Sequence, residues 1–267
     1  MATKIITVAN QKGGVGKTTT VINLGHGLAQ AGKQVLLIDL DPQAQIASAL
    51  SCPQESGIYY LLTMGRRNAA EISFVKTLVR STGRNDLWYI PGSFETVRAQ
   101  NDVINRNPPA SIGHIRESLE VFFGNGLDYL IIDTSPSIGG LQERALWAAD
   151  LAIIPTNMDY LSNEGVANVI GDLKELVGDK DWGGKLLGIL PTFYDDRTRA
   201  ARDSMGQLTS AFQKSVLPPV HQSTVFAGAS SEGLTIFEYA ESNSGNNYAK
   251  RAESEYQQLA EIVLKAR

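Results

Sequence analysis

The sequence predicts an α/β fold in which a doubly wound, mostly parallel sheet is flanked by helices on both faces. Three features of the chain indicate this fold. Several short segments are continuously apolar, which is typical of parallel strands buried on both faces. Segments of helix length, with apolar residues at helical spacing, lie between these strands. A glycine-rich loop, residues 13–16, follows the first apolar segment and opens a helix.

The predicted elements alternate along most of the chain. A strand rich in Ile, Thr and Val is expected at residues 4–9, and a helix closed by Gly32 is expected at 17–31. The other predicted strands are residues 34–39, 87–91, 127–133, 151–155 and 185–191. The other predicted helices are residues 58–66, 71–80, 94–105, 110–123, 162–177 and 247–266. Ligands of such sheets bind at the carboxyl ends of the strands, where the loop, Asp39 and Asp133 fall.

Length and composition favour one large domain, residues 1–267, without an internal repeat or a linker. The first strand begins almost at Met1, so we expect no N-terminal DNA-binding domain. No apolar run is long enough to span a bilayer, and no signal peptide precedes the glycine loop. A single cysteine, Cys52, excludes an internal disulfide, and a reducing cytoplasm is therefore the expected compartment.

The charge of the chain does not by itself indicate binding to nucleic acid. The net charge is −4, and the whole deficit lies in residues 151–267 because residues 1–150 are neutral. Any contact with DNA must therefore come from a local basic patch.

The strongest motif is the segment 11–19, Gln-Lys-Gly-Gly-Val-Gly-Lys-Thr-Thr. Its end is a P-loop, in which backbone N–H groups cradle a polyphosphate, Lys17 reaches the β/γ oxygens and Thr18 binds Mg²⁺. The common form of this loop has a glycine where Gln11 stands, and the next position holds a second lysine, Lys12. A lysine at a loop edge is usually just solvated, but so close to a phosphate cradle it indicates a second phosphate contact.

Three carboxylates at strand ends extend this site. Asp133 follows a buried strand, as the Walker B carboxylate that orients Mg²⁺ through water does. Asp39 and Asp41 point the same way in an extended chain, so Asp39 can face the metal while Asp41 meets the attacking water. The structural alternative is that one of them caps a helix, a role that an Asp before Pro42 suits.

Together these motifs resemble those of the ParA/Soj partition ATPases, in the wider family that includes MinD. Residues 12–19, 39–43 and 132–137 are similar to the family's deviant Walker A, switch I and Walker B/switch II motifs. The likeness runs along nearly the whole chain, although residues 231–239 match more loosely. The resemblance implies a P-loop NTPase fold of the deviant Walker A type.

The resemblance also implies a mechanism with ATP and Mg²⁺ as cofactors. Lys17 would bind phosphates in its own subunit, Lys12 would reach the partner's nucleotide in an ATP-dependent homodimer, and Asp41 would position the water. Hydrolysis would be slow alone and stimulated by a ParB-like partner. The expected nucleotide-binding residues of the loop are Lys12, Gly13, Gly14, Val15, Gly16, Lys17, Thr18 and Thr19, and the expected metal residues are Thr18, Asp39 and Asp133. From their place at a strand end, Pro191 and Thr192 are expected to contact the adenine.

Nonspecific DNA is the other implied partner, bound through phosphate contacts. Arg197 matches a basic position of the family, and Arg199 and Arg202 extend it along one helix face. Asp195, Asp196 and Asp203 lie among them, so an ordinary mixed-charge surface helix is the alternative. Two positions depart from the family pattern: Ser135 replaces a proline in switch II, and Val225 stands where a second DNA-contacting arginine is usual.

Other classes of protein fit less well. A MinD-like membrane-cycling ATPase needs an amphipathic anchor, but the final helix has no Phe or Trp on its apolar stripe of Tyr248, Ala252, Tyr256, Leu259, Val263 and Leu264. We expect that stripe to pack on the core, without a membrane partner. An iron–sulfur reductase needs cysteines that bind the cluster, and this chain has one cysteine. It also lacks the tyrosine-rich tail and membrane segments of a bacterial tyrosine kinase, and it shows no substrate-site motif of a metabolic ATPase. The favoured interpretation is a nucleoid-associated, cytoplasmic ATPase that positions a plasmid or chromosome.

Overall fold

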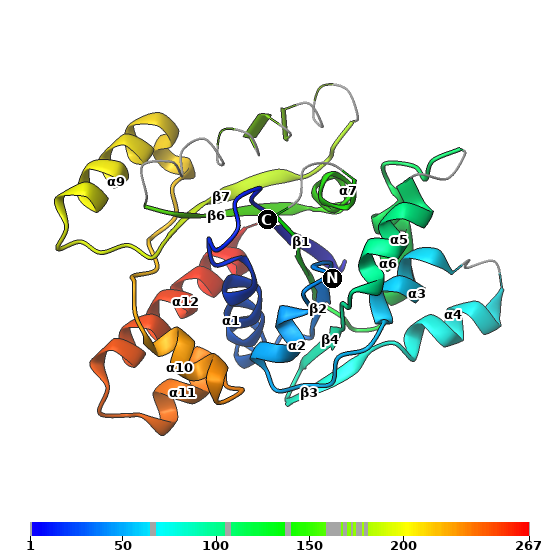
Figure 1. Ribbon diagram of the computed structural model, residues 1–267, viewed down its shortest axis with the longest axis horizontal. Coiled ribbons are helices and arrows are strands. Elements are labelled where there is room, and N and C mark those ends of the chain that lie inside the picture. The colour runs from blue at the N-terminus through cyan, green and yellow to red at the C-terminus, as the bar shows by residue number, and fades with distance from the viewer. Residues whose placement is uncertain are drawn as a thin grey trace.

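The computed structural model places seven strands in one sheet with helices on both faces (Figure 1). It describes residues 2–64, 68–104, 108–136, 140–158 and 181–266, and six further residues between 167 and 178. The strand order is β3-β4-β2-β5-β1-β6-β7, so the chain starts near the centre and builds outward in both directions. All neighbouring strands are parallel except β3 and β4, which confirms the predicted doubly wound sheet.

Six of the seven strands were predicted, and the polar edge strand was missed. The strands are β1 Lys4–Val8, β2 Val35–Asp39, β3 Arg80–Arg84, β4 Leu87–Ile90, β5 Tyr129–Asp133, β6 Leu151–Asn157 and β7 Lys185–Thr192. β3 has the sequence Arg-Ser-Thr-Gly-Arg, with an irregular register before Arg84, and only Thr82 is buried. Such a segment lacks the apolar pattern of a strand and forms one because it pairs with β4. At the other edge, β7 is bridged by Val216 through Ile189.

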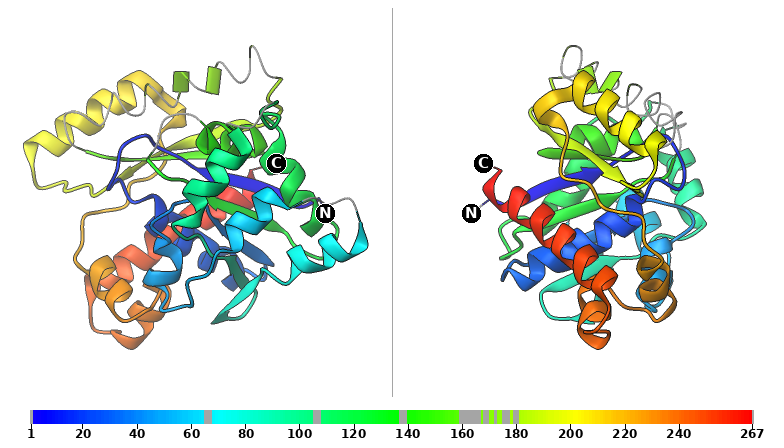
Figure 2. Two further views of the ribbon diagram at one scale, coloured as in Figure 1. Left: turned by 45° about the vertical axis from the view of Figure 1, so that its right-hand side comes forward. Right: turned by 90° about the vertical axis from the view of Figure 1, so that its left-hand side faces the viewer.

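The helices lie in two groups on opposite sides of the sheet (Figures 1 and 2). On one side lie α1 Lys17–Gln30, α2 Gln45–Ala49, α10 Val225–Ser231, α11 Ile236–Ser242 and α12 Asn247–Lys265. On the other lie α3 Gly57–Thr63, α4 Ala69–Lys76, α5 Glu95–Ile104, α6 His114–Leu119, α7 Leu141–Ala148 and α9 Arg199–Phe212. Alternate strand residues enter the two cores: Ile6 and Leu37 face α1, whereas Ile5 and Leu36 face the other group.

Several predicted helices are shorter than expected. The helix predicted at 71–80 ends at Lys76, because the chain turns there into β3. The helix predicted at 110–123 is α6 followed by a 3₁₀ turn, Glu120–Phe122. Most of the helix predicted at 162–177 lies outside the described residues.

The final helix packs on the core, as expected. Tyr256 and Val263 are buried against α1 and the sheet. The predicted stripe was wrong at its two ends, since Tyr248 is 66 % exposed and Leu264 is 37 % exposed. Core contacts reach both ends of α12, since Ala249 and Val263 are completely buried, and Tyr248 and Leu264 lie on either side of the buried face. Within the described ranges, no helix is both long and apolar enough to cross a membrane.

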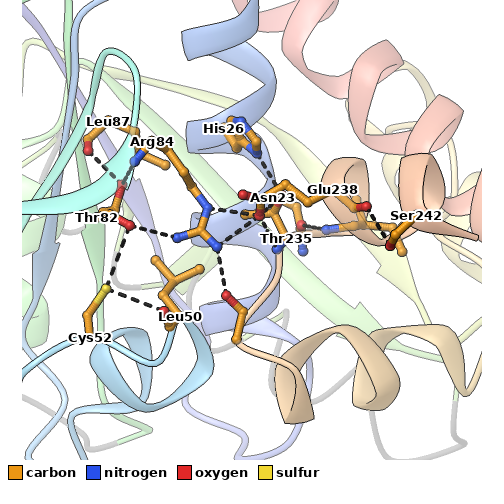
Figure 3. A network of polar contacts seen from close by, with 12 residues as sticks. Asn23, His26, Leu50, Cys52, Thr82, Arg84, Leu87, Thr235, Glu238 and Ser242 are labelled. Atoms are coloured by element: carbon orange, nitrogen blue, oxygen red, sulfur yellow. Dashed lines mark hydrogen bonds and ion pairs between the residues drawn. The ribbon is translucent and has the colours of Figure 1, made fainter.

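A polar network joins α1, the β3–β4 hairpin and the start of α11 (Figure 3). Arg84 donates to the Glu238 carboxylate at 2.8 Å and to the Gly233 carbonyl at 2.7 Å. Glu238 closes the capping box of α11 by accepting from the Thr235 N–H. His26 of α1 lies 2.6 Å from the Thr235 hydroxyl. The network therefore ties three segments that are far apart in sequence.

Parallel pairing brings the ends of the central strands to one edge. Val8 of β1 and Asp39 of β2 are both in register with Asp133 of β5. The glycine loop after β1 and the two carboxylates thus meet at the carboxyl edge of the sheet, where the sequence predicted a ligand site.

Candidate nucleotide site

The glycine loop between β1 and α1 has the geometry of a phosphate cradle. Gly14 and Gly16 adopt left-handed φ angles of 70° and 83°, which glycine does at little cost. Gly16 is also the N-cap of α1, so the N–H groups of the first turn have no capping side chain and face the loop. The cleft at this point has a volume of about 470 Å³. Its lining residues are Gly13, Gly14, Gly16, Lys17, Thr18, Thr19, Asp41, Pro42, Gln43, Gln45, Pro136 and Phe193.

Lys17 is a buried amine within this loop. Its side chain is only 7 % exposed, and Nζ donates to the Lys12 carbonyl at 2.9 Å. Burial lowers the pKa of Lys17, while the carboxylates of Asp133 and Asp41 act in the opposite direction. A desolvated cation surrounded by loop N–H groups is a strong partner for an anionic phosphate.

Thr18 and Asp133 form the metal end of the site. The Thr18 hydroxyl donates to Asp133 Oδ2 at 2.6 Å. Asp133 Oδ1 is buried and accepts no hydrogen bond of normal geometry from the described residues. Burial and the nearby Asp41 raise the pKa of Asp133 to about 7, against the lowering effect of the Thr18 hydrogen bond. A hydroxyl and a carboxylate oxygen left without a donor fit Mg²⁺, which prefers oxygen ligands.

The two aspartates of the 39–43 motif have different surroundings. Asp41 lines the cleft and is 8 % exposed, and its Oδ1 accepts the Gln43 N–H at 2.9 Å. Asp39 is fully buried and accepts two backbone N–H groups, from Asp41 and from Ile46. Burial and the adjacent Asp133 carboxylate raise the pKa of Asp39 well above its usual range. Neither Asp39 nor Asp133 is among the described residues that line the cleft, but Asp133 is joined to the lining residue Thr18 by a hydrogen bond.

Lys12 lies at the rim of the loop and not inside it. Its backbone N–H donates to Asn10 Oδ1 at 2.9 Å, and its half-buried side chain donates to Asn157 Oδ1 at 3.3 Å. Asn10 in turn donates to the Pro155 carbonyl at 2.8 Å. These contacts hold the second lysine on the end of β6, outside the cradle that surrounds Lys17.

The end of β7 flanks the loop on its other side. Thr192 is buried, and its hydroxyl donates to the Val15 carbonyl at 2.9 Å. Phe193 follows with a left-handed φ of 51° and lines the cleft beside Gly16. Of the predicted pair Pro191 and Thr192, Thr192 contacts the loop itself, whereas the Pro191 carbonyl accepts the Val220 N–H.

The sequence did not identify Gln45, Pro136 or Phe193 as lining residues. Gln45 Oε1 lies 3.4 Å from the Thr18 hydroxyl oxygen, a long contact at the metal end, because the hydroxyl hydrogen is donated to Asp133. The sequence offered one indication for them, which is that each lies next to a predicted motif or at the end of a predicted strand.

The three predicted DNA-contacting arginines lie at and before the start of α9. Arg197 is 81 % exposed but pairs with both carboxylate oxygens of Asp195 at 2.8 and 2.9 Å, and these hydrogen bonds lower the pKa of Asp195 to about 2. Arg199 lies 3.6 Å from Asp203, and Arg202 donates to the Asp196 carbonyl. The structure therefore places the arginines on one exposed helix end among acidic partners.

A phosphate loop at the first β–α turn, with a carboxylate at the end of the adjacent strand, defines a P-loop NTPase. The family model described as AAA domain matches residues 3–181. Relatives match over almost the whole chain, and the chain belongs to the ParA/Soj family of partition ATPases.

Two sequence relatives illustrate this membership. The chromosome-partitioning ATPase Soj of Thermus thermophilus is 36 % identical over 260 residues, which are 97 % of this chain and 94 % of the relative. The sporulation initiation inhibitor protein Soj of Bacillus subtilis is 32 % identical over 241 residues, which are 88 % and 91 % of the two chains.

Solved structures show the same fold. Cobyrinic acid a,c-diamide synthase of Mycobacterium smegmatis, with bound ADP and magnesium, has a TM-score of 0.76 at 26 % identity and covers 98 % of this chain and 94 % of its own. A McdA–ATP complex of Cyanothece has a TM-score of 0.81 at 20 % identity, with 99 % and 98 % covered, and is similar in fold alone.

Proposed function

We propose that this chain is an ATP-dependent dimerising ATPase that carries a cargo by binding and releasing nonspecific DNA. ATP and Mg²⁺ are its cofactors, and a plasmid or chromosome is the cargo that its partition relatives favour. It acts in the cytoplasm on the nucleoid, with a ParB-like activator. The observation that carries the proposal is the pair of lysines in one loop, with Lys17 buried in the cradle and Lys12 at its rim.

Within one chain, the described residues divide the chemistry between them. The loop N–H groups and the buried Lys17 hold the phosphates, and Thr18 and Asp133 provide oxygens for Mg²⁺. Mg²⁺ held there would supply positive charge that offsets the charge of the phosphates. Asp41, which lines the same cleft, orients the attacking water through its carboxylate. Thr192 and Phe193 fix the flank of the loop on the side proposed for the adenine.

The position of the Lys12 side chain supports the proposed dimer. Its side chain lies on β6 at the outside of the cradle, where it can leave Asn157 for a phosphate presented by a second chain. Nucleotide would then be shared by two subunits, so that ATP favours the dimer and hydrolysis releases it.

Light scattering and a gel shift test the proposal together. With a slowly hydrolysed ATP analogue and Mg²⁺, we expect a dimer that retards a mixed-sequence duplex, whereas ADP gives a monomer that does not. Equal DNA retention with ATP and ADP would contradict the carrier mechanism. ATP-dependent sedimentation with anionic liposomes, in place of DNA binding, would favour the MinD-like alternative.

A further inference from the structure

The conformation of the segment after β2 depends on one buried carboxylate. Asp39 is the last residue of β2 and is completely shielded from solvent. Its Oδ1 accepts the Asp41 N–H at 3.1 Å, and its Oδ2 accepts the Ile46 N–H at 3.1 Å. The two donors stand at opposite ends of the turn that leads into α2. A single side chain therefore joins both ends of this turn.

No other side chain of this turn accepts the N–H groups of Asp41 and Ile46 among the described residues. Ala44, the N-cap residue of α2, has an apolar side chain and a left-handed φ of 51°, a strained backbone conformation for alanine. The Asp41 carboxylate is occupied in part by the Gln43 N–H. The Asp39 carboxylate thus satisfies the N–H groups of Asp41 and Ile46 in a place where burial makes an unpaired donor costly.

Gly92, which follows β4, lies very close to the backbone of the same turn. A Cβ atom at position 92 would come within 2.5 Å of the Asp39 carbonyl and 2.8 Å of the Asp41 carbonyl. Only glycine fits there without moving the backbone on which Asp41 stands. The backbone of Asp41 is therefore held from two directions, by the Asp39 side chain and by the close approach of Gly92.

The metal end of the site uses other atoms. The Thr18 hydroxyl donates to Asp133 and not to Asp39, and at this end of the site Asp133 Oδ1 is a buried oxygen that accepts no hydrogen bond of normal geometry from the described residues. Both oxygens of Asp39 already accept backbone N–H groups. Each oxygen keeps a second lone pair, but both oxygens are engaged by the turn, and among the described residues no hydrogen bond joins Asp39 to Thr18.

We infer that Asp39 is a positioning residue for Asp41 and not a metal ligand. Its carboxylate fixes the backbone from Asp41 to Ile46, and thereby the place where the Asp41 carboxylate meets water. The inference rests on the proposed role of Asp41 and replaces the metal role that the sequence predicted for Asp39.

Asp39→Asn tests the inference, since an amide can accept one of the two N–H groups but opposes the second with its own NH₂. We expect kcat for ATP hydrolysis to fall by about 100-fold, because a misplacement of about 1 Å has an effect of that size. The KM for ATP and the Mg²⁺ concentration for half-maximal rate should stay within about two-fold. Asp102→Asn, on the exposed face of α5, is the matched control and should leave all three values unchanged.

Gly92→Ala is a second, independent variant in case Asp39→Asn does not fold. Its added Cβ collides with the Asp39 and Asp41 carbonyls and comes within 3.2 Å of Asp39 Cγ, so it displaces the same turn while every carboxylate is retained. We expect the same loss of kcat with unchanged Mg²⁺ dependence. Circular dichroism and cooperative thermal unfolding establish which variants are folded. A folded variant of either kind with normal kcat would overturn the inference. So would an Asp39→Asn protein whose rate is restored by about ten-fold more Mg²⁺, because that is the behaviour of a lost metal ligand.

Asp41→Ala separates this inference from the proposed function. If Asp41→Ala abolishes turnover while Asp39→Asn does not, the positioning role of Asp39 is wrong and the proposed function stands. If Asp41→Ala hydrolyses ATP normally, the proposed role of Asp41 is wrong and the inference fails with it.

Discussion

At the scale of single residues, the two lysines of the loop carry the same ammonium group in different surroundings. Lys17 is desolvated and lies against the Lys12 carbonyl, whereas the Lys12 side chain is half-buried and bonded to Asn157. A buried amine is suited to the phosphates of its own chain. An amine at the rim is suited to a ligand that arrives with another molecule.

Lys12→Ala should therefore weaken dimerisation and leave ATP binding to the monomer nearly intact. Removal of one charge-assisted hydrogen bond across an interface corresponds to about 1.5–3 kcal/mol, or roughly 10–100-fold in the dimer dissociation constant. Sedimentation velocity with a slowly hydrolysed ATP analogue measures the dimer, and nucleotide titration of the monomer measures binding. Lys214→Ala, an exposed lysine near the end of α9, is the control. An unchanged dimer in Lys12→Ala would remove the intersubunit role.

The motif residues were predictable because their types and spacing carry the chemistry. Lys17, Thr18, Asp41 and Asp133 meet in the structure as the sequence indicated. The environment of Asp39 was not predictable, since it depends on the backbone path from Asp41 to Ile46. That path includes a left-handed alanine, which the sequence does not reveal.

At the scale of elements, the network in Figure 3 connects the phosphate-loop helix with the polar edge hairpin. Arg84 has a side-chain exposure of 9 %, and its partner Glu238 has 29 %. Such a pair is more sensitive to removal of one partner than an exposed pair, because the remaining charge is left partly desolvated. β3 is therefore held by this ion pair as well as by its pairing with β4.

Arg84→Ala should lower the free energy of unfolding by about 3 kcal/mol. A loss of this size corresponds to a fall in the melting temperature of roughly 6–12 °C, and nearer the lower end for a chain of 267 residues. Arg80→Ala, in the same strand, removes a more exposed pair with Glu55 and should cost less than about 1 kcal/mol. Thermal and urea unfolding measure both variants, and equal losses would show that burial of the pair has no effect.

His26 makes the same network sensitive to pH. Burial lowers the pKa of His26 below its ordinary value of 6.5, with Glu238 opposing and Arg84 reinforcing that effect. The unfolded chain then binds a proton that the folded chain resists, so His26 reduces stability as the pH falls below about 6.5. The loss approaches about 1.4 kcal/mol per pH unit.

His26→Gln should flatten this part of the pH dependence. The difference in urea midpoint between pH 7.5 and pH 5.5 is the measurement, taken for wild type and variant, so that other titrating groups cancel. An identical difference in the two proteins would show that His26 is not the source. Gln keeps a group able to bond the Thr235 hydroxyl, which makes it a better replacement than Ala.

Strands and helices could be predicted from the sequence where their own residues carry the pattern, and not where strand pairing or packing by other segments determines them. Continuous apolar segments such as Leu36–Ile38 were identifiable without a structure, because burial on both faces leaves a plain signal. The β3 segment has no apolar pattern, and it forms a strand because its backbone hydrogen-bonds to the edge of β4. α12 was predicted to pack on the core, but the width of its buried face, which leaves out Tyr248 and Leu264, depends on the packing around it.

At the scale of the whole molecule, the charge around α9 decides whether DNA can bind there. Arg197, Arg199 and Arg202 are close together, but Asp195 pairs with Arg197 through two hydrogen bonds. A phosphate must compete with that carboxylate, so binding through this surface should be weak and salt-dependent.

Arg197→Ala should weaken ATP-dependent DNA binding and lower the salt dependence. Removing one cation–phosphate pair reduces the slope of log K against log salt by about 0.9 per protomer. Asp195→Asn should have the opposite effect on affinity, because Arg197 then has no competing charge. Arg98→Ala, on α5, is the control for removal of a positive charge elsewhere. Fluorescence anisotropy at several salt concentrations measures all three, and unchanged slopes would move the DNA surface away from α9.

The edges of the sheet restrict how copies of the molecule can meet. β3 is short, polar and irregular, and β7 is bridged by Val216, so neither edge offers a long row of free backbone groups. Sheets that join through their edges form continuous ribbons that are slow to separate. A protein whose copies must part after every nucleotide cycle gains from edges that do not adhere. If the chain pairs as proposed, the lifetime of the pair would depend on the phosphate contact of Lys12 and not on strand pairing.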